Sequence, residues 1–177
     1  MISKERVIYL KHRLNVFKGN PFKWYRPEAW AWFFRSFVCL WQRATKGYCF
    51  RDVWALDDFY SVLFINTLEE LAEITHGYPQ EFLVNYPPTD IEDDKGFRAW
   101  QDMLFRIARH FELGLEDNEW DYNTFTGERY AKQEEDGWFR SLSDEYIEHL
   151  KNVAKQKKEN TSIGLDLLKK YYHDLWD

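Results

Sequence analysis

The chain of 177 residues has few of the residues that cross-link or interrupt a fold: two cysteines, eight glycines and five prolines. Cys39 and Cys49 are too few for a disulfide scaffold. Both sit among aromatic residues, where a free thiol behaves as a small apolar group. The sequence contains no C-x-x-C motif, which excludes a zinc site of the usual cysteine type. We expect neither a bound metal nor another cofactor.

Long apolar segments are also missing. The longest apolar run covers only residues 29–34, far short of the roughly 20 residues that cross a bilayer. The first residues show neither the apolar stretch nor the cleavage site of a signal peptide. We therefore expect a protein of a reducing cytoplasm that has no membrane partner.

Aromatic residues, in contrast, are abundant, since Phe, Trp and Tyr make up 19% of the chain, with nine tryptophans. The net charge of −6 also conceals two opposed blocks. Residues 1–51 carry 11 Lys and Arg against two acidic residues, whereas residues 52–94 carry 11 Asp and Glu and no Lys or Arg. We expect these blocks to neutralise each other within the fold or across a homodimer.

Apolar spacings of three and four residues predict helices in the first half of the chain. A short amphipathic helix is predicted over residues 7–17. A second is predicted over residues 27–46, because Pro27 suits a first helical turn and Gly47 suits a stop. A broad face of Trp, Phe and Leu side chains marks this second helix as a core element.

Asp52 is the predicted N-cap of a central helix over residues 53–75. His76-Gly77-Tyr78-Pro79 marks its end. We expect this helix to be the hub of the fold, packed against the aromatic helix before it, with Trp54 in the shared core. Asp57 and Asp58 interrupt its apolar pattern, which predicts structural ion pairs with Arg51 or the basic N-terminal helices.

The second half of the chain continues the helical pattern. The predicted elements are an acidic loop over residues 80–95, a helix over 96–112, a polar-aromatic loop over 114–137 with a possible hairpin at Thr126-Gly127, a helix over 143–158 and a last helix capped by Ser162. Together these elements predict an all-α fold, a single domain over residues 1–177 built from five to six helices.

Three stretches resemble a known group of sequences. Residues 47–57, Gly-Tyr-Cys-Phe-Arg-Asp-Val-Trp-Ala-Leu-Asp, match the pattern G-[FY]-x-x-x-D-x-W-x-L-D. His76-Gly77-Tyr78-Pro79 and the terminal Leu175-Trp176-Asp177 are two further marks of the same group. The group comprises uncharacterised small proteins encoded by phages and prophages. The resemblance implies a viral origin and a helical fold, and it brings no known activity.

The sequence shows no recognisable catalytic motif, neither a phosphate loop nor a nucleophile elbow nor a zinc-protease pattern. The lack of such motifs and the excess of aromatic residues favour a non-catalytic protein that binds a host protein, such as a defence component, in the host cytoplasm. Interface cores favour Trp, Tyr, Phe and Arg. The candidate partner-binding residues are Tyr48, Arg51, Asp52, Trp54, Asp57 and Tyr78.

Three alternatives stay open. Cations and aromatic rings alternate around residues 18–26, and such a segment can hold a nucleic acid through Lys18, Lys23, Trp24 and Arg26, although the low pI of about 5.4 disfavours it. Glu70 and Glu73 have the spacing of a Glu-x-x-Glu turn, which supplies Mg²⁺ ligands in helical nucleotide hydrolases. A virion component is the third alternative.

Overall fold

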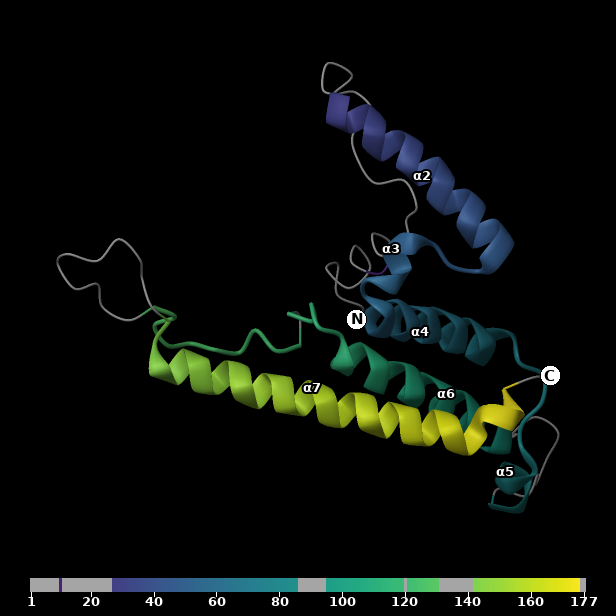
Figure 1. Cartoon of the computed structure of the whole chain (residues 1–177). Helices are drawn as coiled ribbons and strands as arrows, with labels where there is room; N and C mark the ends of the chain where they lie inside the picture. Colours follow the sequence, from purple (N-terminus) through teal and green to yellow (C-terminus); the bar gives the residue numbers. More distant parts are fainter. Residues whose placement is uncertain (1–9, 11–26, 86–94, 120, 131–141, 176–177) are drawn as a thin grey trace. The chain divides into compact units, whose positions relative to one another are not determined.

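The computed structural model describes Leu10 and residues 27–85, 95–119, 121–130 and 142–175. Within these residues the fold is all-α, with six α-helices, one short 3-10 helix and no strand (Figure 1). The predicted fold class is therefore confirmed. None of the helices in the described ranges is long and apolar enough to cross a membrane.

Contacts divide the chain into two compact units, residues 1–62 and 63–177, and the boundary falls inside a helix. A single domain over residues 1–177 therefore stays a prediction. The predicted helix over residues 7–17 lies outside the described residues, apart from Leu10, which is helical and buried.

In the first unit, α2 spans Pro27–Lys46, as the sequence predicts. Gly47 ends it with a positive φ of 81°, and its N–H donates to the Arg43 carbonyl at 3.0 Å. This left-handed residue closes the last turn and reverses the chain toward the next helix.

Gly47 supplies a test of this turn. A Cβ at this position would meet no atom within 4 Å, so Gly47→Ala changes only the backbone energy. We expect a loss of about 1–2 kcal/mol, the penalty of an L-residue in the left-handed region. Denaturant unfolding measures it, and Gly47→Asn should lose less, since asparagine tolerates this conformation.

The helix that follows starts earlier than the sequence predicts. A short helix, α3, spans Phe50–Val53, and its N-cap is Cys49 rather than Asp52. Asp52 is instead the third helical residue, and its carboxylate accepts from the Cys49 N–H at 2.8 Å. A turn at residues 54–55 then separates α3 from α4, Leu56–Ile74. The predicted N-cap was wrong because Asp52 caps the helix from its first turn, as in a capping box.

The apolar face of α2 and the side chain of Trp54 are not core. Among the α2 residues whose burial the structure describes, only Ser36 and Cys39 are buried, whereas Trp41 is 71% exposed. Trp54, at the end of α3, is 90% exposed. The predicted core position of Trp54 was therefore wrong. Apolar periodicity identifies an amphipathic face, but it does not decide what that face meets.

The second unit is built around α6, Lys95–Gly114, and α7, Asp144–Tyr171, which lie side by side. The predicted acidic loop contains a short helix, α5, over Gln80–Asn85, and its remainder, 86–94, lies outside the described residues. The core gathers on one face of α6 and on the residues that meet it. It includes Ile65, Leu68, Ala72, Phe82, Trp100, Leu104, Ile107, Ala108, Phe111, Leu115, Leu168 and Tyr171.

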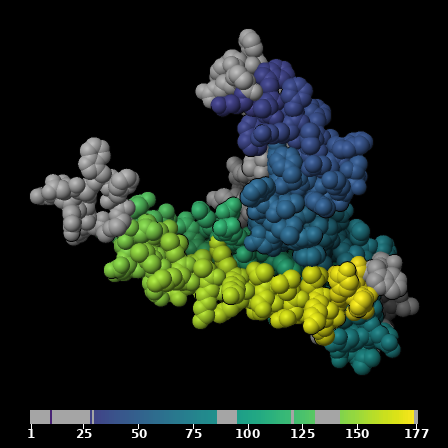
Figure 2. Space-filling view, viewed as in Figure 1, coloured from purple at the N-terminus to yellow at the C-terminus, as the bar shows by residue number. Residues whose placement is uncertain are grey.

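The two predicted C-terminal helices are one helix. Ser143 caps α7, since its hydroxyl accepts from the Tyr146 N–H at 3.2 Å. Figure 1 draws α7 as one unbroken helix from green to yellow, and its atoms form a band of the same colours in Figure 2. The polar stretch over residues 155–160 continues the helix, and its side chains contact α6 and the segment that follows α6. Lys157 Nζ donates to the Glu116 carbonyl at 2.6 Å, and the Asn160 amide lies 3.0 Å from His110 Nδ1.

The described parts of the predicted polar-aromatic loop, residues 115–119 and 121–130, are non-helical, as expected. No strand pair flanks Thr126-Gly127 within them. An isolated antiparallel bridge joins Tyr130 to Leu142, and the Ser143 N–H donates to the Arg129 carbonyl at 3.1 Å. These contacts bring the loop back to the start of α7.

Candidate protein-binding site

A disulfide fastens α3 to α2. Cys39 and Cys49 are bonded, with their Cα atoms 5.0 Å apart, and both are buried. The expectation of two free thiols was therefore wrong. Cys39 lies on the buried stripe of α2, and the reversal at Gly47 returns the chain to it within ten residues. Closing such a short loop is worth about 2–3 kcal/mol, mainly by restricting the unfolded chain.

Asp52 locks the same junction with its carboxylate. The Arg43 guanidinium donates to both oxygens, from Nη2 at 2.6 Å and from Nε at 3.0 Å. The Asp52 side chain is almost fully buried. One carboxylate therefore caps α3 and clamps α2, and this ion pair joins one residue of the basic block to one of the acidic block. Neutralisation of the two blocks as a whole stays a prediction. Asp52 supports the site and is not part of its surface.

Arg51 lies among aromatic rings. Its guanidinium carbon is 5.3 Å from the Trp32 ring centre and 5.6 Å from that of Phe50, and Arg35 approaches Trp32 at 5.9 Å. Burial lowers the pKa of Arg51, and repulsion from Arg35 and Arg43 lowers it further, against the attraction of Asp52. The junction thus combines arginine side chains with aromatic rings, two residue classes that are enriched in interface cores.

Four side chains around this junction face solvent and form what we call the α3 surface: Tyr48, Phe50, Val53 and Trp54. Trp54 is the most exposed of them. Asp57, one turn further on in α4, is also exposed. Three of the sequence-predicted residues, Tyr48, Trp54 and Asp57, are thus accessible in the first unit. They lie around the ion pair of Arg43 and Asp52 that holds α3 in place.

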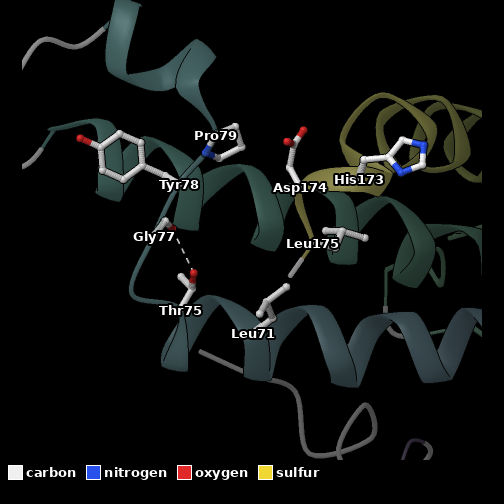
Figure 3. Close-up of a pocket in the computed structure, with 8 residues that line it drawn as sticks. All are labelled: Leu71, Thr75, Gly77, Tyr78, Pro79, His173, Asp174 and Leu175. Atoms are coloured by element: carbon white, nitrogen blue, oxygen red, sulfur yellow. Dashed lines mark hydrogen bonds between the residues drawn. The ribbon is translucent and has the colours of Figure 1, made fainter. Parts of the chain in front are cut away.

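Tyr78 lies elsewhere, at a cavity of about 210 Å³ in the second unit. The end of α4, the turn before α5 and the 3-10 helix η1, Tyr172–Asp174, surround this cavity. The rings of Tyr78 and His173 lie at opposite sides of it (Figure 3). Gly77, Tyr78 and Pro79 thus line the same cavity as Leu175 near the end of the chain. Thr75 Oγ1 donates to the Gly77 carbonyl at 3.0 Å and fixes the turn.

Within the described residues, the carboxylates of the Mg²⁺ alternative belong to no larger cluster of potential ligands. Glu70 and Glu73 are both exposed on α4, and no group of three or more potential metal ligands occurs in the described ranges. Lys18, Lys23, Trp24 and Arg26 lie outside the described residues.

Sequence reasoning missed a second cavity, of about 200 Å³, between the loop after α6 and the first half of α7. Phe125, Tyr146 and His149 stack against one another there, with ring centres 5.1–6.2 Å apart. Its cations already serve the fold: Arg129 donates to the Asn123 side chain, and Lys157 to a backbone carbonyl. The polar character of the loop gave no signal of this packing.

Comparison of the chain with protein-family models, with curated proteins and with solved structures gives no match.

Proposed function

We propose that the chain is a non-catalytic protein-binding module and that the α3 surface engages its partner, with Trp54 as the central anchor. The observation that carries the proposal is the exposure of Trp54, 90% of whose side chain is accessible. A large aromatic ring left in water gains free energy when a partner covers it. Tryptophan is also among the residues most enriched at interface hot spots.

The support beneath Trp54 favours tight binding. The Cys39–Cys49 disulfide and the Asp52–Arg43 ion pair hold α3 on both sides of its first turn. An anchor that is rigid before binding loses less conformational entropy on association, so more of its burial energy appears as affinity. The buried carboxylate and disulfide thus act as positioning elements for the exposed ring.

The resemblance to phage-encoded proteins makes a host protein, such as a defence component, the expected partner. The expected outcome of binding is that this protein is inhibited or redirected. The place of action that follows is the host cytoplasm. Both sulfurs of the disulfide are buried, which protects the bond from thiol exchange, since exchange needs access to a sulfur.

Substitution of Trp54 tests this proposal. The partner is first captured from host cells with the tagged chain. Trp54→Ser should then weaken binding to this captured protein at least about 30-fold, the effect of removing a hot spot worth about 2 kcal/mol, while the unfolding midpoint stays unchanged. Titration calorimetry with the purified partner measures it. Leu83→Ser, an exposed apolar residue on α5, is the matched control and should leave the affinity unchanged.

Two outcomes would contradict the proposal. One is an unchanged affinity of the Trp54→Ser variant for the captured protein. The other is the failure to retain any host protein, combined with Mg²⁺-dependent nucleotide turnover that Glu73→Gln abolishes. Salt-sensitive binding to DNA or RNA in place of a protein would likewise favour the nucleic-acid alternative.

A further inference from the structure

A second apolar surface lies on α2, separate from Trp54. Its residues fall within one half of the helix circumference at 100° per residue, and none of them carries a charge. We call this set the α2 stripe. It comprises Trp30, Phe33, Phe34, Phe37, Val38, Leu40, Trp41 and Ala44.

Every member of the α2 stripe is at least partly exposed to solvent. Phe33 is half-buried and every other member is exposed, with Phe34 at 63% and Trp41 at 71%. Ring contacts give the stripe a fixed surface, since Phe33 packs on Phe37 at 5.0 Å and on Trp30 at 6.3 Å between ring centres. The buried face of the same helix, marked by Ser36 and Cys39, points elsewhere.

The size of the stripe matches one half of a stable interface. An aromatic side chain buries roughly 150–250 Å², so the exposed fractions sum to apolar area on the order of 600 Å². That is at the top of the range of roughly 300–600 Å² for the largest apolar patch on a monomer. A standard interface buries about 800 Å² per partner. The polar residues around the stripe would supply the area that the stripe itself does not.

Most of the stripe is arranged symmetrically about Phe37. Phe34 and Leu40 lie three residues on either side of it, Phe33 and Trp41 lie four, and Trp30 and Ala44 lie seven. Val38 falls outside this symmetry, since its counterpart is the buried Ser36. A two-fold axis at Phe37 would therefore place each of these six flanking residues of an antiparallel α2 against another of the six in a second copy. The bulky Trp30 would meet the smallest side chain of the stripe, Ala44, as close packing requires.

We propose that the α2 stripe is a homodimer interface in which α2 packs antiparallel against α2 of a second copy, about a two-fold axis at Phe37. A two-fold interface must be self-complementary, and the α2 stripe meets this condition because it is apolar throughout and buries no like charges. The antiparallel arrangement also opposes the two helix dipoles. This interface leaves the α3 surface to a different protein.

Mass and cross-linking test the proposal directly. Sedimentation equilibrium of the full chain at about 50 μM should give twice the 21.7 kDa of one chain. Phe37→Glu should give a monomer with an unchanged helical circular dichroism spectrum. Leu83→Glu, a charge placed on exposed α5, is the matched control and should stay dimeric. A monomeric wild-type chain would overturn the proposal. If that monomer also binds anionic lipid vesicles, and Phe37→Glu abolishes the binding, the stripe would be a membrane-binding surface instead.

Single cysteines test the register. Under mild oxidation, Phe37→Cys should form a covalent dimer with itself. Trp30→Cys and Ala44→Cys should each stay monomeric on a denaturing gel, and an equal mixture of the two should cross-link. Self-linking of Trp30→Cys and of Ala44→Cys would show a parallel pair and overturn the antiparallel register. Because these readouts need no host partner, they are independent of the capture experiment on Trp54.

Discussion

Replacement of Trp100 by alanine should lower the free energy of unfolding by about 3–5 kcal/mol, the cost of truncating a buried tryptophan. Trp100 is 1% exposed. Its ring centre lies 5.5 Å from that of Phe82 on α5 and 5.5 Å from that of Tyr171 at the end of α7. Loss of the indole would leave a cavity where three helices of the second unit meet. Denaturant unfolding followed by circular dichroism measures the loss.

Trp54→Ala is the matched control, because it makes the same truncation at an exposed site. We expect a change within about 0.5 kcal/mol, as for surface substitutions in general. The two tryptophans thus separate core from surface within one chain. A loss of several kcal/mol for Trp54→Ala, or a loss below 1 kcal/mol for Trp100→Ala, would contradict the assignment of these side chains.

Replacement of Asp52 by alanine should also be severe, with a loss of about 3–5 kcal/mol from the junction of α2 and α3. The substitution removes the partner of a mostly buried guanidinium, Arg43, and leaves the Cys49 N–H without its acceptor. Breaking a buried ion pair from one side has this cost because a charge stays behind without compensation. Amide hydrogen exchange across α3 should report the loss locally.

The comparison with Asp57→Ala gives this prediction its control, since Asp57 is an exposed carboxylate nearby and should matter little. A double-mutant cycle of Asp52→Ala with Arg43→Ala isolates the pair. The double variant should lose less than the sum of the single variants, because neither charge is then left unpaired. Additive losses would mean that the two side chains do not act together.

Much of the helical pattern could be predicted from the sequence because its signals are local. The bounds of α2 follow from Pro27 and Gly47, and α6 follows from apolar spacing between Phe97 and Phe111. The division of α7 into two helices was wrong. The sequence shows a polar stretch there, but it does not show that Lys157 and Asn160 bond to Glu116 and His110 and so belong to a packed helix. The prediction of Asp52 as an N-cap was wrong for a related reason. Its carboxylate accepts hydrogen bonds from the Cys49 N–H, three residues earlier, and from Arg43 on α2.

The candidate site could be predicted only in part. Sequence reasoning selected Tyr48, Arg51 and Trp54, and the structure places them at one junction. It could not separate anchors from supports, because exposure depends on where the neighbouring helix lies. The pairing of Cys39 with Cys49 was missed as well. A signal was present, since Cys39 shares one face of α2 with Ser36, opposite the α2 stripe, and Gly47 turns the chain back toward that face.

The central claim is that the exposed Trp54 of a rigid α3 surface anchors a host protein. Its most direct test is quantitative affinity capture from host cells, with tagged wild-type chain, Trp54→Ser and Leu83→Ser compared side by side by mass spectrometry. We predict one host protein in stoichiometric amount with wild type and Leu83→Ser, and its loss with Trp54→Ser. Equal recovery of that protein by all three chains would contradict the claim.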